Sequence, residues 1–196
     1  MNSSFGGLSH HHALRIYRQL AWPIDGCEIG RGFSEFAEQF RNSLDTNRWN
    51  SIWAVTLTLK QVIVHADGTR DFIDLYQCRK NFRQFMRRLG RASFGSAAAR
   101  RGKRLRVIPV HEKSQYERFH SHAALEGPRH LNEIEFSRLI RTCWVKTPWS
   151  YRDVSIRPSA DRGWVNYLLK PRGKSGLELW SDCIDWDAFH NPTADA

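Results

Sequence analysis

The chain has 196 residues, which is enough for one well-cored domain with a short appendage and limits it to one catalytic unit. Hydrophobic residues make up 41% and aromatic residues 12% of the chain, which is typical of a folded protein and excludes a disordered tail. Lys and Arg number 30 against 20 Asp and Glu, and the net charge of +10 favours nucleic acid as a partner, although a basic protein without such a partner can carry the same charge.

The first part of the chain combines a lead-in, a helix and a strand. Residues 1–31 mix Gly, Ser, His and Pro, and the stretch 14–20 predicts a short helix there. Apolar residues at helical spacing behind a Ser N-cap predict a helix over Ser34–Leu44. Ser51–Val64 is rich in β-branched and aromatic residues and is expected to form a strand, with a turn at Asp67-Gly68 after it. One face of that strand is expected to carry Trp53, Val55, Leu57 and Leu59, and the other face Thr56 and Thr58.

Two basic segments follow. Leu75–Leu89 places apolar residues every three or four positions with arginines between them, which predicts an amphipathic helix with a basic surface. Each of these arginines can contact DNA or simply face solvent, and the pattern does not separate the two. The stretch from Gly90 to Arg104 is small and basic, so we expect a mobile loop that approaches phosphates. Its candidate DNA contacts are Arg101, Lys103 and Arg104.

The second half of the chain alternates strands and helices. Leu105–Glu112 and Arg118–Leu125 predict two strands, and their short polar connection is typical of an antiparallel hairpin. A helix is expected over Asn132–Val145, a strand over Tyr151–Ile156, and a further helix over Trp164–Leu169 that ends before a proline. The inward face of the first of these helices is expected to carry Ile134, Phe136, Leu139, Ile140 and Cys143.

This order of elements is typical of an α+β fold in which helices flank a central antiparallel sheet. We expect a helical extension over residues 1–45, one folded domain over residues 46–172, and a tail over residues 173–196 that packs back on the domain.

The cysteines and the hydropathy bear on the compartment. The four cysteines lie far apart without a CxxC pair, which predicts reduced thiols in a cytosol-like compartment. No run of about 18 apolar residues is present, and the amino terminus lacks the apolar segment of a secretory signal. We therefore expect a soluble protein in the cytoplasm of a prokaryotic cell, or in a host-cell compartment that holds nucleic acid, with no membrane partner.

A histidine pair marks the candidate chemistry. His120 and His122 lie two apart in a predicted strand, so both side chains point to the same side, within reach of one cation. A lone pair of this kind is weak evidence, because nine histidines in the chain can produce one by chance. Glu112 ends the neighbouring strand, where its carboxylate can supply the oxygen ligand that Mg²⁺ or Mn²⁺ prefers, and Glu126 is the alternative. His111 should face the other way.

Tyr167 is the candidate nucleophile. On the predicted helix it shares a face with Lys170, three residues later. A tyrosine can attack a phosphodiester when a cation polarises the phosphate and nearby positive charge stabilises the phenolate. By itself a tyrosine on a helix is more often a packing residue, so the inference depends on the whole set of residues.

Together these residues resemble the three motifs of the HUH endonucleases, in the order used by rolling-circle replication initiators. The matching segments are Val55–Thr58, Glu112, Phe119–Ala123, Tyr167 and Lys170, and the resemblance covers roughly residues 51–171. It implies a ferredoxin-like or RRM-like sheet, and it implies that Thr56 and Thr58 line the sheet near the DNA.

The resemblance also implies roles for individual residues. The ligands of a divalent metal would be His120, His122 and Glu112. Tyr167 would form a 5′-phosphotyrosyl link to DNA and release a 3′-hydroxyl, and Lys170 would assist at the phosphate or in loading the metal. The partners would be single-stranded or hairpin DNA, with host replication proteins as further candidates.

Several features depart from the family pattern. The residue between the two histidines is usually bulky and apolar because it points into the core, whereas here it is Ser121. One tyrosine lies in the third motif, which argues against a two-tyrosine mechanism, and no ATPase follows. Relaxases place the tyrosine before the histidines, and Tyr167 follows them.

We therefore expect an enzyme that nicks and rejoins single-stranded DNA at an origin. A single-tyrosine transposase has the same motif order and stays open as an alternative. A DNA-binding regulator that kept the fold and lost catalysis stays open as well, and Ser121 favours it. An RNA-binding sheet domain could stack bases on Trp53 or Tyr116, but it leaves the histidines and Tyr167 unexplained.

Overall fold

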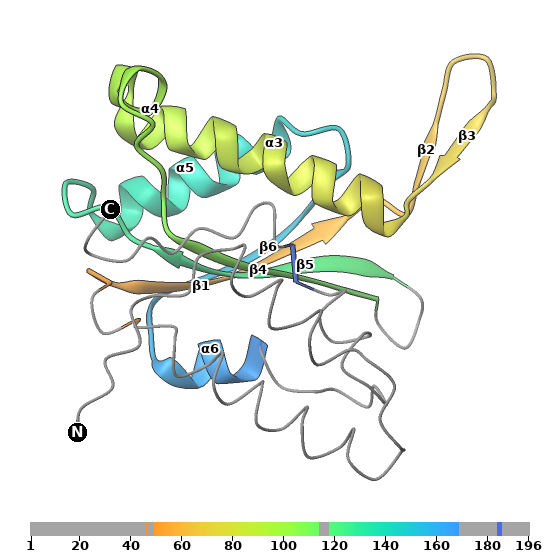
Figure 1. Cartoon of the computed structure of the whole chain (residues 1–196). Coiled ribbons are helices and arrows are strands. Elements are labelled where there is room, and N and C mark those ends of the chain that lie inside the picture. Colours follow the sequence, from red (N-terminus) through yellow and green to blue (C-terminus); the bar gives the residue numbers. More distant parts are fainter. Residues whose placement is uncertain (1–45, 47–48, 114–117, 169–183, 186–196) are drawn as a thin grey trace, which may run out of the picture.

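The computed structural model of the chain describes residue 46 and residues 49–113, 118–168 and 184–185 (Figure 1). Its centre is a four-stranded antiparallel sheet with the strand order β4-β5-β1-β6. The strands are β1 (Ile52–Leu59), β4 (Val107–Lys113), β5 (Phe119–Glu126) and β6 (Ser150–Ala160). The predicted α+β fold with helices flanking an antiparallel sheet is therefore confirmed.

Two helices cover one face of this sheet. They are α3 (Leu75–Phe94) and α5 (Glu133–Val145), and they lie side by side above the strands (Figure 1). The core between sheet and helices includes the alternate residues of β1 that the sequence predicts to share one face. Its buried members from β1, α3 and α5 are Trp53, Val55, Leu57, Leu59, Cys78, Phe82, Phe85, Leu89, Phe136, Ile140, Cys143 and Trp144.

The opposite face of the sheet carries the short helix α6 (Arg162–Leu168; Figure 1). The indole Nε1 of Trp164 donates a hydrogen bond to the carbonyl oxygen of Ala123 at 3.0 Å, which ties this helix to β5. The sheet therefore separates the α3 and α5 side of the molecule from the α6 side.

Local sequence sets the starts of both long helices. The Asp74 carboxylate accepts a hydrogen bond from the backbone N–H of Gln77 at the start of α3. Asn132 and Glu135 form a reciprocal capping box at the start of α5. These side chains satisfy backbone N–H groups that have no partner within the helix, and they fix where each helix begins.

The strand predicted over Ser51–Val64 is wrong in its second half. β1 ends at Leu59, and β2 (Val62–Val64) pairs instead with β3 (Arg70–Phe72) in a separate hairpin. The side chain of Gln61 donates to the Leu59 and Phe119 carbonyl oxygens and accepts from the Phe119 N–H. These hydrogen bonds join Gln61 to the first residue of β5, next to the end of β1. The predicted turn is present, with Gly68 at a φ of 83°.

The basic loop predicted from Gly90 to Arg104 is also wrong over most of its length. Helix α3 continues through Gly90 to Phe94, and α4 (Ser96–Arg100) follows after Gly95. Leu89 and Ser93 are buried one turn apart, so the inward face of α3 extends past its predicted end, and the alanines that follow favour helix.

One inward residue of α5 was also predicted wrongly. Ile134 is 72% exposed, whereas Phe136, Ile140 and Cys143 are buried and Leu139 packs against the core. Ile134 precedes Phe136 by two residues, which places it about 200° around the helix, on the opposite side.

The ends of the domain are described only in part. The helices predicted at residues 14–20 and 34–44 lie outside the described residues. In the tail, Ile184 forms a β-bridge with Val110, and the Asp185 N–H donates to the Pro109 carbonyl oxygen at 3.2 Å, so this piece of the tail lies along the free edge of β4. Among the described helices, none combines the length and the apolarity needed to cross a membrane.

Candidate metal centre

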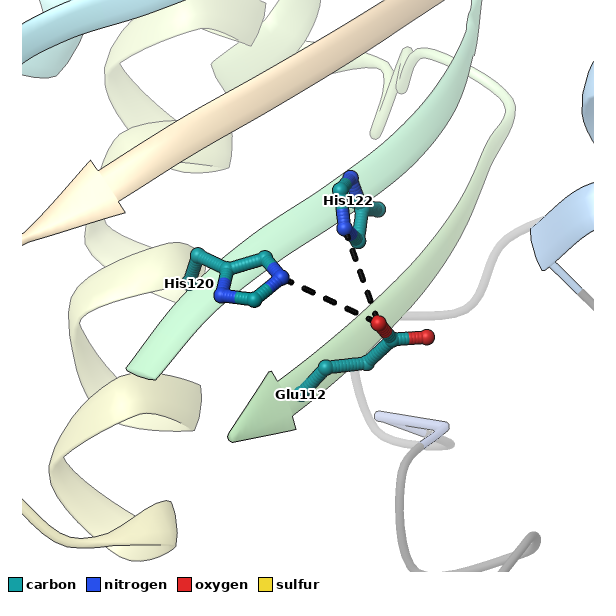
Figure 2. A group of neighbouring side chains, drawn as sticks. All are labelled: Glu112, His120 and His122. Atoms are coloured by element: carbon teal, nitrogen blue, oxygen red, sulfur yellow. Dashed lines mark ion pairs between the residues drawn. The ribbon is translucent and has the colours of Figure 1, made fainter. Parts of the chain in front are cut away.

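Glu112, His120 and His122 meet on the sheet face that carries α6. β4 and β5 pair so that Glu112 lies directly opposite His120, and the alternation of the strand puts His122 on the same face. The two imidazole Nε2 atoms lie 3.8 Å (His120) and 3.7 Å (His122) from the Glu112 Oε2, as Figure 2 shows. One ligand atom from each residue lies within 4.8 Å of the other two, which is close enough for all three to hold one cation.

Hydrogen bonds to the other ring nitrogens orient both imidazoles. The Nδ1 of His120 lies 3.3 Å from the carbonyl oxygen of Arg118, which can only accept, so Nδ1 donates this hydrogen bond and, in the neutral ring, Nε2 carries the lone pair. The Nδ1 of His122 lies 2.9 Å from the hydroxyl of Thr56 on β1. Partners of this kind fix the ring orientation and tautomer of metal-binding histidines, and here both rings turn Nε2 toward Glu112.

The group is partly sheltered yet accessible. The exposed fraction of the side chain is 22% for His120, 9% for His122 and 13% for Glu112. Two imidazoles and one carboxylate suit several divalent cations, and three protein ligands would leave room for water or a phosphate oxygen. The three residues can therefore hold a metal ion without fixing which one.

Glu126 does not join this group. Its Oε1 accepts a hydrogen bond from the Asn50 N–H at 3.0 Å and lies 3.6 Å from the Arg106 guanidinium, at the end of β5 that pairs with Ile52. The choice of Glu112 over Glu126 as the acidic residue beside the histidines therefore agrees with the geometry.

A buried polar chain lies directly behind the candidate ligands. His111 points to the α3 side of the sheet, as predicted, and its ring contacts Phe82. Its Nδ1 lies 2.8 Å from the Ser121 hydroxyl, and its Nε2 lies 3.3 Å from a carboxylate oxygen of Asp185 in the tail. Burial is the main reason that the pKa of His111 is lowered. In the neutral ring, Nε2–H donates to the carboxylate and the Ser121 hydroxyl donates to Nδ1.

This chain gives Ser121 a structural role. The serine is fully buried and stands between the two histidines of β5, while His111 is the neighbour of Glu112 on β4. A polar residue in the core is costly only when it lacks a partner, and this one has a partner. The polar residue between the two histidines therefore has a hydrogen-bond partner, His111, on the neighbouring strand.

Tyr167 lies beside the candidate ligands. The centroid of its ring is 6.2 Å from that of His122, and it stacks on Trp164 with 5.2 Å between centroids. Trp164 also meets the His122 ring edge-on at 5.7 Å. The Tyr167 side chain is 44% exposed. Lys170, which was predicted to share a helix face with Tyr167 and to assist at the phosphate, lies outside the described residues.

The remaining predicted residues have different surroundings. Thr58 donates its hydroxyl proton to the Asp153 carbonyl oxygen on β6, whereas Thr56 supports His122. Arg101, Lys103 and Arg104 are exposed beyond α4, and Lys103 lies over the Phe94 ring at the end of α3, so they belong to the opposite side of the sheet from the ligands (Figure 1).

The sequence did not predict the roles of three residues near the candidate ligands. Thr56 is the hydrogen-bond partner of His122, Trp164 contacts the His122 ring, and Asp185 lies beside His111. The Thr-Leu-Thr pattern marked Thr56 but not its contact, because the contact joins residues 66 positions apart. No protein-family model, curated protein or solved structure matches the chain. Inference about function therefore rests on the geometry of these residues.

Proposed function

We propose that the chain is a metal-dependent endonuclease that nicks and rejoins single-stranded DNA through Tyr167. The observation that carries the proposal is the position of the Tyr167 ring next to His122, one of three residues that can hold a cation. The basic character of the chain, with a net charge of +10, supports a phosphodiester substrate.

The proposed reaction is a transesterification. The Tyr167 hydroxyl oxygen attacks the phosphorus and loses its proton to solvent, the bond from phosphorus to the 3′ oxygen breaks, and that oxygen takes up a proton. DNA stays joined to the enzyme through a 5′-phosphotyrosyl ester, which conserves the bond energy for rejoining, so no ATP is consumed. A bound Mg²⁺ or Mn²⁺ would polarise the phosphate. Lys170 is proposed to stabilise the charge that develops there.

The chain's own residues supply orientation. Thr56 and the Arg118 carbonyl hold the two imidazoles, and Trp164 supports the Tyr167 ring by stacking. Reactants held in the right geometry react much faster than free ones, and the hydrogen bond from Trp164 to β5 supports such a positioning role for α6, which carries Tyr167.

We further propose that nicking occurs at a replication origin, on single-stranded or hairpin DNA, during rolling-circle replication. This setting would place the chain in the prokaryotic cytoplasm or in a host-cell compartment that holds nucleic acid.

The test is cleavage of labelled single-stranded oligonucleotides with Mn²⁺ present. The wild-type chain is expected to form a covalent adduct with DNA and a shorter product, and Tyr167→Phe is expected to form neither. Tyr76→Phe is the matched control, because Tyr76 is an exposed tyrosine on α3, on the far side of the sheet. Adduct formation by Tyr167→Phe contradicts the role of this residue. Salt-dependent DNA binding by the wild-type chain, without cleavage on any oligonucleotide in Mn²⁺, contradicts the enzyme and indicates a binding protein.

A further inference from the structure

The positive charge of the chain is concentrated in one segment. Residues 75–111 contain eleven of the 30 basic residues and none of the 20 acidic residues. The rest of the chain therefore has 19 basic and 20 acidic residues, and its net charge is −1. This segment alone accounts for the basic character of the protein.

Most basic residues of the segment are exposed on the α3 side of the sheet. Its exposed basic residues come from the outer face of α3, from α4 and from the turn after it, and α3 and α4 pack together. They are Lys80, Arg87, Arg88, Arg91, Arg100, Arg101, Lys103 and Arg104, here called the basic face. The basic face joins both basic segments that the sequence singled out.

Residues of α3 in the basic face line a groove. It has a volume of 310 Å³, and its described lining residues are Gln84, Arg87, Arg88 and Arg91. In the part of the chain that the structure describes, no acidic side chain forms an ion pair with these three arginines. Their charge is thus available to an anionic partner.

We propose that the basic face binds the phosphate backbone of duplex DNA, as a second DNA contact on the opposite side of the sheet from Glu112, His120 and His122 (Figure 1). The choice of DNA over RNA rests on the proposed function, whereas the binding itself requires no cleavage.

The surface suits a duplex better than other anionic partners. Helix α3 has 20 residues and is about 30 Å long, so it can lie along a stiff duplex backbone over that length. Arg pairs with phosphate through two parallel hydrogen bonds.

The experiment measures binding of a blunt, labelled duplex by fluorescence anisotropy at several salt concentrations, without metal and in a Tyr167→Phe background. The test variant changes Arg87, Arg88 and Arg91 to Gln. The matched control changes Arg138, Lys146 and Arg152 to Gln, which removes the same charge from exposed positions outside the segment. Thermal unfolding verifies that both variants are folded, and replacement of the three arginines by Lys retains the charge.

The test variant is expected to lose at least tenfold in affinity at moderate salt, with a salt slope smaller by about 2 to 3, because each lost phosphate contact removes about 0.9 from the slope. The Lys variant is expected to keep most of the slope. Equal losses in test and control variants indicate a general charge effect and overturn the proposal. Unchanged duplex binding overturns it in favour of an acidic protein partner, and tighter binding of duplex RNA overturns the choice of DNA. Oligonucleotide nicking is measured separately, on the test variant with Tyr167 intact. Failure of the duplex-binding proposal can therefore be distinguished from failure of the proposed nuclease.

Discussion

The hydroxyl of Thr56 offers the sharpest test of the candidate metal centre. It lies 2.9 Å from the Nδ1 of His122, and that bond turns the Nε2 of the ring toward Glu112. Thr56→Val removes the hydroxyl, keeps the branched shape of the side chain and preserves the preference of β1 for extended backbone. The variant therefore changes the orientation of one ligand with little other disturbance.

The size of the effect follows from the lost hydrogen bond. A hydrogen bond of this kind contributes about 0.5–1.5 kcal/mol, and loss of an outer partner of a metal-binding histidine typically weakens metal binding about 10- to 100-fold. The site is partly exposed, so water can replace the hydroxyl to some extent, and we expect a loss near the lower end, about tenfold or 1.4 kcal/mol.

The matched control is Thr58→Val. Thr58 lies two residues along the same strand, is buried to a similar degree, and donates its hydroxyl proton to the Asp153 backbone rather than to a candidate ligand. Mn²⁺ affinity is measured by isothermal titration calorimetry for both variants, with thermal unfolding as the check on the fold. A tenfold loss for Thr56→Val with no change for Thr58→Val supports the assignment. Equal affinities in wild type and Thr56→Val refute the reasoning, and so does an equal loss in the two variants.

Three further predictions concern stability and reactivity. Because burial lowers the pKa of His111, the unfolded chain binds a proton at this residue more readily than the folded chain does. The free energy of unfolding should therefore fall as the pH drops below about 6.5. Urea titrations should show a weaker pH dependence of this free energy for His111→Gln. Gly127→Ala should lower the unfolding free energy by about 1–3 kcal/mol, because the added Cβ would overlap the Ser51 hydroxyl and the Trp53 indole. Gly90→Ala on α3, where no atom of the described residues lies within 4 Å of an added Cβ, should raise the unfolding free energy by about 0.5–1 kcal/mol. A stabilised Gly127→Ala would contradict the packing. Burial raises the pKa of the Cys78 thiol to about 12, so this thiol should not react with Ellman's reagent in the native protein. Cys78→Ser should therefore leave the number of reactive thiols unchanged in the native protein and lower it by one in the unfolded protein. A lower number in the native protein would show that this thiol is accessible.

Local patterns in the sequence determine much of this protein. Alternation along a strand places His120 and His122 on one face and His111 on the other, and the short connection between β4 and β5 makes their pairing a hairpin that sets Glu112 opposite His120. The N-caps of α3 and α5 and the apolar periodicity of both helices are local in the same way. These features involve residues near one another in the chain, so propensity and spacing are enough to predict them.

The two wrong predictions of secondary structure concern segments whose structure depends on contacts with the rest of the fold. The β-rich composition of Ser51–Val64 contains no sign that Gln61 bonds to Phe119 and ends β1 early. The small basic residues after Gly90 resemble a loop, yet packing of Leu89 and Ser93 against the core keeps that part of α3 helical.

Tertiary structure alone decided what surrounds the three candidate ligands. Insertion of β1 between β5 and β6 brings Thr56 to His122, and packing of α6 on β5 brings the Tyr167 ring beside the same histidine. The tail brings Asp185 to His111 across 74 positions of sequence. The residue types of a metal centre could therefore be read from the chain. Their hydrogen-bond partners and the neighbouring tyrosine could not, because strand order and helix packing depend on the whole core rather than on any local pattern.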